Sequence, residues 1–294
     1  MKLAFWLSTL EASGGAKVFL EHARRLEARG HEVTVARGKD ARPPGGNLVV
    51  TRYRDVEPAL AVSDRVIHLV QGLDVPEGNV FARWRKRARV RRALAARTRK
   101  VVVSRHLQEK FEGSLLAPTG IDLEVFRPGE PARSRRVLVA GQGPTKGIDL
   151  AFAVLAQVPG IEVVHLALRP EDTASHAHVR ASSLGEAETA ALIRSAAVYL
   201  STVSAEEGFD LVALEAMASG TACVLSGGGA HHELAPDLVS GFDPGALTRD
   251  LTRALDDPAE RTRRVERGLA VARERSWDRV IERVEAAYAA ALRS

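Results

Sequence analysis

Short apolar runs alternate with amphipathic helical segments along almost the whole chain, and this alternation restricts the fold more than any other feature. KLAFWLS at 2–8 predicts a strand, and a glycine turn at 13–15 and a helix over 16–29 follow it. Gly30 ends that helix, and HEVTVAR at 31–37 predicts the next strand. These elements form a βαβ unit. Because repeated βα units imply a parallel sheet with helices on both faces, we expect an α/β fold.

A segment rich in Pro, Gly and charge at 118–136 interrupts the alternation, which suits a linker between two domains. We therefore expect two Rossmann-like domains, at 1–130 and 131–276, and a helix at 277–294 that packs back on the first domain. The other expected strands are 47–52, 65–72, 100–105, 136–141, 161–168, 178–182, 198–203 and 221–227, and the other expected helices are 148–157, 185–196 and 211–219.

Composition excludes several classes of protein. The chain has 294 residues with 45% hydrophobic and 27% charged side chains, which are ordinary globular values. A single cysteine, Cys223, excludes a disulfide scaffold or a thiolate-rich metal site, and we expect it in the core. No apolar run approaches the length of a membrane-spanning helix, and the first apolar run leads directly into a turn and a helix, unlike a signal peptide. We therefore expect a cytoplasmic protein.

Residues 83–100 carry ten basic side chains and no acidic one. The whole chain has a net charge of +5, so the residues outside this segment sum to −5. One interpretation is a solvated, Arg-rich helix that follows the composition of the chain. A second is docking on anionic membrane lipid, at the inner face of the membrane. Nucleic-acid binding is disfavoured, because no recognition motif or stacking platform accompanies the charge.

Parallel sheets bind ligands at the carboxyl ends of their strands, so the loops that follow the strands are the candidate sites. Gly14 and Gly15 open the first helix, where free backbone N–H groups favour an anion. The glycine-rich turn 141–147 does the same in the second domain, and Gly143 and Lys146 lie in it. Neither turn has the spacing of a dinucleotide fingerprint or a P-loop. Tight turns without a ligand, and a solvated lysine, are the alternatives.

The segment 204–220, SAEEGFDLVALEAMASG, holds the most informative pattern. Glu207 precedes Gly208, and Glu215 lies eight residues later on the predicted helix. The glycine allows close approach of a ligand, and the start of the helix directs free N–H groups towards it. The two acids could accept hydrogen bonds from two sets of hydroxyls. A capping acid and a surface glutamate are the alternative.

This segment resembles the signature of glycosyltransferase family 4, in which two glutamates flank seven residues within a Glu-Gly-Phe-Gly-Leu … Glu-Ala-Met-Ala-x-Gly pattern. Four other segments are similar to parts of the same family: SGGAKVFLEHARRLEARGHEVTV, APTGIDLEVFRP, VLVAGQGPTKGIDL and ERSWDRVIERVEAAY. The resemblance covers both expected domains.

The resemblance implies a GT-B fold, in which two Rossmann-like domains face each other across a cleft. It also implies retaining transfer of a hexose or deoxyhexose from a nucleotide-diphosphate sugar, with no metal ion and no cofactor. The acceptor, a glycan, a lipid-linked molecule or a small molecule, is not specified. The implied catalytic residues are Glu207, Lys146 and His68, and the implied donor-binding residues are Gly14, Gly15, Gly143, Lys146, Glu207, Gly208, Phe209, Asp210, Leu211 and Glu215.

In this assignment Glu207 contacts the hydroxyls of the donor sugar and Glu215 holds the ribose. Lys146 neutralises the departing diphosphate. The backbone N–H groups of residues 209–211 reach the sugar and the diphosphate, and the glycine pair at 14–15 lines the opposite wall. His68 matches a histidine that faces the reacting sugar, although a buried core histidine fits its position equally well.

Two residues of the expected donor site depart from the family pattern, besides Thr119, which replaces an asparagine of the linker. Gln142 stands where the family has an arginine, which removes one cation for the diphosphate unless another arginine replaces it. Asp210 stands where the family has a glycine and adds negative charge beside the expected donor site. These departures motivate a second hypothesis, a GT-B-like nucleotide-sugar-binding or partner subunit with little transferase activity.

Overall fold

The computed structural model describes residues 1–10, 13–73, 80–129 and 133–293. The chain forms two compact units: Met1–Thr119 together with Val280–Ser294 is unit 1, and Gly120–Arg279 is unit 2. Each unit contains one sheet, and all strand pairings within these two sheets are parallel, as the alternation of strands and helices predicted. The two divisions of the chain lie after Thr119 and after Arg279, whereas the sequence placed them after 130 and after 276.

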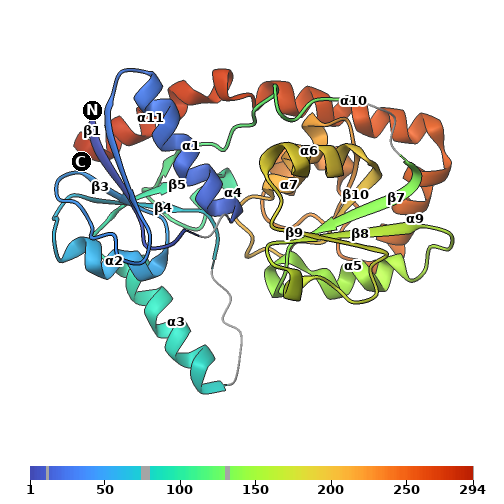
Figure 1. Cartoon of the computed structure of the whole chain (residues 1–294), viewed down its shortest axis with the longest axis horizontal. Coiled ribbons are helices and arrows are strands. Elements are labelled where there is room, and N and C mark those ends of the chain that lie inside the picture. The colour runs from blue at the N-terminus through green and yellow to red at the C-terminus, as the bar shows by residue number, and fades with distance from the viewer. Residues whose placement is uncertain (11–12, 74–79, 130–132, 294) are drawn as a thin grey trace. The chain divides into compact units, whose positions relative to one another are not determined.

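Unit 1 contains a sheet of order β2-β1-β3-β4-β5-β6 (Figure 1). Its strands are β1 Lys2–Leu7, β2 Glu32–Arg37, β3 Leu48–Val50, β4 Val66–Val70, β5 Arg99–Val102 and β6 Leu115–Leu116. Its helices are α1 Gly14–Ala28, α2 Tyr53–Leu60, α3 Val80–Ala95, α4 Arg105–Gln108 and most of α11, Trp277–Arg293. The strands expected from the sequence are all present, and the structure adds β6 and α2, which contains Pro58, where no element had been bounded from the sequence.

The C-terminal helix α11 completes one apolar face of the unit 1 sheet. The ring of Tyr288 on α11 lies 5.8 Å from that of Phe5 on β1, and Phe5 lies 5.0 Å from Phe19 on α1. Tyr288 also hydrogen-bonds to Nδ1 of His22 at 3.1 Å. Burial lowers the pKa of His22 to about 3, so this histidine is neutral at physiological pH.

Unit 2 contains a sheet of order β11-β10-β7-β8-β9. Its strands are β7 Arg133–Ala140, β8 Glu162–Ala167, β9 Val179–Ser182, β10 Ala196–Ser201 and β11 Ala222–Leu225. Its α-helices are α5 Ile148–Leu155, α6 Glu186–Arg194, α7 Leu211–Ala218, α8 His231–Leu234, α9 Pro244–Asp256 and α10 Pro258–Glu274, and its 3₁₀ turns are Pro144–Lys146, Pro170–Asp172 and Pro236–Leu238.

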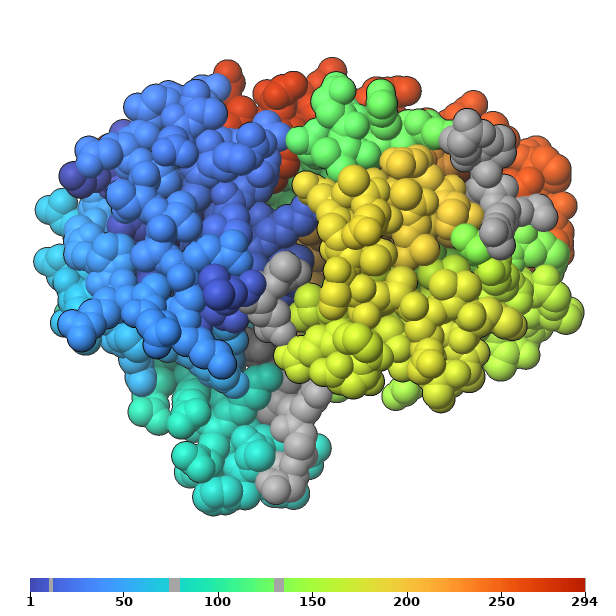
Figure 2. Space-filling view, viewed as in Figure 1, coloured from blue at the N-terminus to red at the C-terminus, as the bar shows by residue number. Residues whose placement is uncertain are grey.

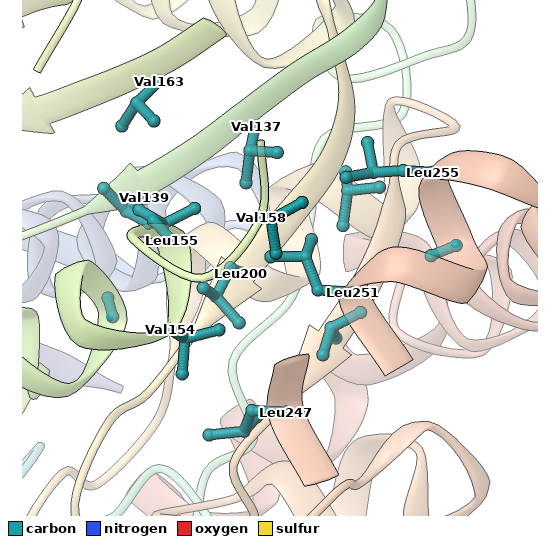
Figure 3. Packing of buried hydrophobic residues seen from close by; sticks show 14 of the residues in the cluster. Val137, Val139, Val154, Leu155, Val158, Val163, Leu200, Leu247, Leu251 and Leu255 are labelled. Carbon is teal, nitrogen blue, oxygen red and sulfur yellow. The ribbon is translucent and has the colours of Figure 1, made fainter. Parts of the chain in front are cut away.

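Helices cover both faces of the unit 2 sheet (Figure 1). α5 and α9 pack on one face, where side chains such as Val139, Leu155, Leu200 and Leu251 form an apolar core (Figure 3). α6, α7 and α10 cover the other face. A strand buried on both faces carries apolar residues at consecutive positions, which explains runs such as AVYL in β10.

The segment expected to link the two domains is partly buried. Residues 117–121 are buried, and so is Phe126. Ile121 forms a parallel bridge with Ser276, where its N–H donates to the carbonyl of Arg275 at 2.9 Å. Part of this Pro- and Gly-rich segment is therefore buried and bridged within unit 2, whereas residues 127–129 are exposed.

One stability prediction arises from α10, where Arg264 is only 4% exposed. Arg264 donates to Glu260 at 2.8 Å and to the carbonyl of Cys223 on β11 at 2.9 Å. Hydrogen bonds from Arg263, together with Arg264, lower the pKa of Glu260 from 4.5 to about 2. Because the pKa of Glu260 is lower in the folded protein than in the unfolded chain, its ionised form stabilises the fold at pH values above 4.5. We therefore expect the free energy of unfolding to fall as pH drops from 4.5 towards about 2.

The Glu260→Gln variant should lose stability at neutral pH and show a flatter stability curve over that acid range. Urea unfolding across a pH series measures both effects. Glu266→Gln, at an exposed position on the same helix, is the control. An unchanged acid slope in Glu260→Gln would contradict the assignment.

Candidate functional site

The order of the unit 2 sheet reverses between β7 and β10, because the chain runs outwards from β7 to β9 and then returns to β10 on the other side. The carboxyl ends of strands at such a reversal form the usual ligand-binding crevice of open α/β sheets. Three loops begin there: residues 141–147 after β7, 202–210 after β10, and 226–230 after β11. The strongest sequence candidates of the second domain lie in the first two.

Hydrogen bonds tie these loops together. The N–H of Ser204 donates to the carbonyl of Thr145 at 2.9 Å, and Oγ1 of Thr202 donates to the carbonyl of Gly147 at 2.8 Å. Ser226 Oγ donates to the carbonyl of Val203 at 2.9 Å. The three loops are therefore one connected structure.

Two glycines permit this close approach. Gly147 has a φ of +61°, and a Cβ there would lie 2.0 Å from the carbonyl oxygen of Thr202. A Cβ on Gly229 would lie 2.6 Å from the carbonyl oxygen of Glu207. Any side chain at either position would push the loops apart.

Lys146 and Glu207, which the sequence placed in one site, are in contact. Lys146 Nζ lies 3.0 Å from Oε2 of Glu207, and their side chains are 26% and 14% exposed. Burial alone would lower the pKa of Lys146, but the charges of Glu207, Asp210 and Glu215 raise it above its usual value. Lys146 is therefore the cation among three carboxylates. Glu215, on α7, is 3% exposed.

The Asp210 side chain is 1% exposed and turns away from the helix that it precedes, since α7 receives no capping hydrogen bond from it. It accepts hydrogen bonds from Ser201 at 2.5 Å and Tyr199 at 3.3 Å on β10, and lies 3.1 Å from Nε2 of His231. Burial would raise the pKa of Asp210, but the bond from His231 and the charge of Lys146 lower it below its usual range. The negative charge that the sequence added beside the expected donor site is thus buried and hydrogen-bonded.

The geometry also sets the tautomer of His231. The N–H of Gly227 donates to Nδ1 at 3.2 Å, so Nδ1 carries a lone pair. Nε2 then carries the proton and donates it towards Asp210. A neutral histidine therefore connects the loop after β11 to the loop after β10.

The rest of the glycine-rich loop and the Phe209 side chain complete this part of unit 2. Gln142 accepts a hydrogen bond from the N–H of Leu168 at 3.4 Å, and Gly143 lies in the left-handed region with a φ of +78°. Phe209 is 7% exposed, and the guanidinium of Arg275 lies 5.8 Å from its ring centre. Arg275 also pairs with Glu233 at 2.6 Å. Arg275 is thus a cation beside the loop that carries Glu207.

Gly14, Gly15 and His68 lie in unit 1. Ser13 caps α1 by accepting from the N–H of Ala16, and Gln71 donates to the carbonyl of Gly15 at 2.8 Å. His68 is 2% exposed in the interior of β4, where burial and the charge of Lys100 lower its pKa to about 4. The structure therefore has the buried core histidine that the sequence allowed, and contact between His68 and a sugar stays a prediction.

Three residues of the site were not singled out from the sequence in this role: Tyr199, Ser201 and His231. The signal that could have found the first two is the presence of hydroxyls in an otherwise apolar buried strand, beside a buried acid. His231 follows the triple glycine 227–229, which suggests a tight loop but does not indicate the partner of its ring. Within the described ranges, no group of three or more His, Cys, Asp or Glu side chains is placed to hold a metal ion.

Comparison with known families and curated proteins places this site in context. Residues 132–257 match the family model described as glycosyl transferases group 1. An MMP α-(1→4)-mannosyltransferase of Mycolicibacterium hassiacum is 34% identical over 199 residues, which are 60% of this chain and 48% of that protein. A phosphatidyl-myo-inositol mannosyltransferase of Mycobacterium tuberculosis is 29% identical over 198 residues, or 58% and 52% of the two chains. The chain spans about half the length of these curated relatives.

Solved structures share the architecture of both units. Sucrose-phosphate synthase of Thermosynechococcus elongatus has a TM-score of 0.80 at 17% identity, with 100% of both chains covered. HepE of Anabaena, in complex with UDP-glucose, has a TM-score of 0.74 at 14% identity, again with 100% of both chains covered. The chain therefore has the GT-B fold, and residues 132–257 of its second unit match the glycosyl transferases group 1 family.

Proposed function

We propose that this protein is a glycosyltransferase that moves a sugar from a nucleotide-diphosphate sugar to an acceptor, with retention of configuration and without a metal ion. The observation that carries the proposal is the Lys146–Glu207 pair, held at the point where the unit 2 sheet reverses. The group 1 family match and the HepE complex with UDP-glucose support a nucleotide sugar as the donor.

Each residue at this point has a role that suits such a donor. The Lys146 ammonium neutralises charge on the diphosphate as it leaves. The Glu207 carboxylate accepts hydrogen bonds from the sugar hydroxyls, and Glu215 binds the ribose. The backbone N–H groups at the start of α7 point towards the anion. Since Lys146 and Glu207 pair with each other, the donor takes over one partner of each when it binds.

The alternative, a binding or partner subunit with little activity, rested mainly on Asp210 and Gln142. The buried hydrogen bonds of Asp210 remove part of that argument, because its carboxylate is directed into unit 2 and does not contact a donor bound at Lys146. The enzyme hypothesis is therefore preferred.

Glu207→Gln should lower turnover by about 10- to 100-fold, because it replaces a charged hydrogen-bond acceptor by a neutral one. The assay measures donor hydrolysis and transfer with UDP-, GDP- and ADP-sugars, first in the wild-type protein. Glu206→Gln is the matched control, since Glu206 is exposed in the same loop and bonds to Ser204. Absence of turnover with every donor would reject the enzyme hypothesis in favour of the binding subunit.

We further propose that helix α3 brings the protein to an anionic membrane surface that carries a lipid-linked acceptor. The described structure has no helix that is long and apolar enough to cross a bilayer. However, α3 stands out from unit 1 on the face shown in Figure 2, and Val80, Phe81 and Trp84 near its start are 75%, 67% and 66% exposed. Exposed aromatic rings beside arginines suit the interface of an anionic bilayer.

Removing two arginines of α3, in Arg85→Ala/Arg89→Ala, should weaken vesicle binding roughly tenfold or more, since each basic residue adds about 1 kcal/mol near such a surface. Cosedimentation with phosphatidylcholine vesicles, with and without phosphatidylglycerol, measures this. The matched control removes two exposed arginines of unit 2, in Arg180→Ala/Arg249→Ala. Binding that does not depend on phosphatidylglycerol, or an equal loss in the control, would contradict the proposal.

A further inference from the structure

The loop 202–210, which carries Glu207, contains one buried negative charge that the proposed chemistry does not use. Asp210 is 1% exposed, and its carboxylate accepts from Ser201 and Tyr199 and faces His231. A donor cannot replace these partners without opening the interior of the unit. The charge of Asp210 therefore stays in place whether the site is empty, holds a donor or holds a product.

The surroundings of Asp210 do not cancel this charge locally. His231 is neutral by geometry, because its Nδ1 accepts from the N–H of Gly227 while its Nε2 faces the carboxylate. Ser201 and Tyr199 are neutral hydroxyl donors. The charge of Asp210 acts on Lys146, as do the charges of Glu207 and Glu215. An anion that binds at Lys146 consequently also experiences the field of a buried carboxylate.

The proposed donor and its product differ in charge at this place. In a nucleotide-diphosphate sugar the terminal phosphate is esterified, whereas in the released nucleoside diphosphate it can lose a second proton. A terminal phosphate has a second pKa near 6, so the product carries up to about one more negative charge at neutral pH. A fixed negative charge beside Lys146 repels the product more than the donor.

We propose that Asp210, held ionised by Ser201, Tyr199 and the neutral His231, is a specificity-determining residue that makes the site prefer the nucleotide sugar over the free nucleoside diphosphate. Its charge speeds release of the product after each transfer and limits inhibition by it. This inference rests on the proposed function, because it requires a nucleotide-sugar donor at Lys146. Asp210 acts through its field and its backbone, and its side chain touches neither ligand.

Asp210→Asn removes the charge and keeps the size of the side chain. Isothermal titration of UDP with UDP-glucose, GDP with GDP-mannose, and ADP with ADP-glucose first identifies the pair that the wild-type protein binds. For that pair, we expect the ratio of product affinity to donor affinity to rise about fivefold in Asp210→Asn. Product inhibition of turnover should strengthen by the same factor. Asp210→Glu, which retains the charge, should keep a ratio close to that of the wild-type protein.

Glu206→Gln is the matched control, because it removes an exposed carboxylate from the same loop and should leave the ratio unchanged. Asp210→Ser is a second charge-removing variant, measured if Asp210→Asn does not fold. In the wild-type protein, the methyl ester of the nucleoside diphosphate should bind at least as tightly as the free diphosphate, because it lacks the extra negative charge. Neither compound carries a sugar, so the sugar does not contribute to the difference. This comparison needs no variant.

The outcomes separate the two claims. If no nucleotide sugar binds to the wild-type protein, the proposed function fails, and the inference with it. If donor and product both bind but the ratio is the same in Asp210→Asn and in the wild-type protein, only the inference is overturned. A purely structural role would weaken both ligands equally, and a ratio that falls would mean that Asp210 favours the product.

Discussion

Replacing Lys146 with methionine is expected to lower turnover by about 10²- to 10³-fold, the size of effect that follows loss of one group that stabilises transition-state charge. Methionine keeps the length and apolar stem of the side chain and removes only the ammonium. The negative charges of Glu207, Asp210 and Glu215, which act on Lys146, would then repel the diphosphate without that cation. Affinity for the donor should therefore fall as well as turnover.

Steady-state transfer and titration with the nucleotide sugar measure the two effects separately. Lys39→Met serves as the control, because Lys39 is exposed in unit 1 and its loss changes the net charge by the same amount. Thermal unfolding establishes that the variant is folded. Near wild-type turnover in Lys146→Met would show that the diphosphate leaves without help from this lysine, and would remove the central residue from the proposed mechanism.

Much of the fold follows from the sequence because the spacing of apolar residues and the positions of turn residues predict the same elements. Short, mostly apolar runs of five or six residues became strands such as β4 and β10. The parallel pairing follows because helices separate most of these runs. Pattern alone did not separate a linker from a buried segment, since Ile121 and Phe126 are buried by their pairing and packing in unit 2.

One part of the candidate site could be predicted from the sequence and another part could not. Lys146 and Glu207 could be placed together because each follows a strand at the same edge of one sheet, and the structure joins them at 3.0 Å. The environment of Asp210 could not be predicted, because its partners come from β10 and from the start of α8, 21 residues further along the chain. Whether a carboxylate is exposed or buried depends on such distant contacts, which local composition does not encode.

Gly147→Ala is expected to lower the free energy of unfolding by about 3 kcal/mol or more, a large effect for the addition of a single methyl group. The added Cβ would lie 2.0 Å from the carbonyl oxygen of Thr202, and that carbonyl is backbone and cannot rotate away. The loops after β7 and β10 must separate, which also breaks the bond from Thr202 Oγ1 to Gly147. Lys146 is the adjacent residue and would move with them.

Gly241→Ala separates this clash from the cost of backbone conformation. Gly241 lies in the same unit with a φ of +86°, and nothing stands within 4 Å of the Cβ that alanine would add. That variant should lower the free energy of unfolding by only about 1–2 kcal/mol, the ordinary penalty for an L-residue at positive φ. Urea unfolding of both variants gives the difference, and nucleotide titration shows whether binding is lost with it. Equal destabilisation would mean that φ alone requires glycine at 147, whereas a larger loss in Gly147→Ala, with weakened nucleotide binding, would show that the contact between the two loops holds Lys146 in place.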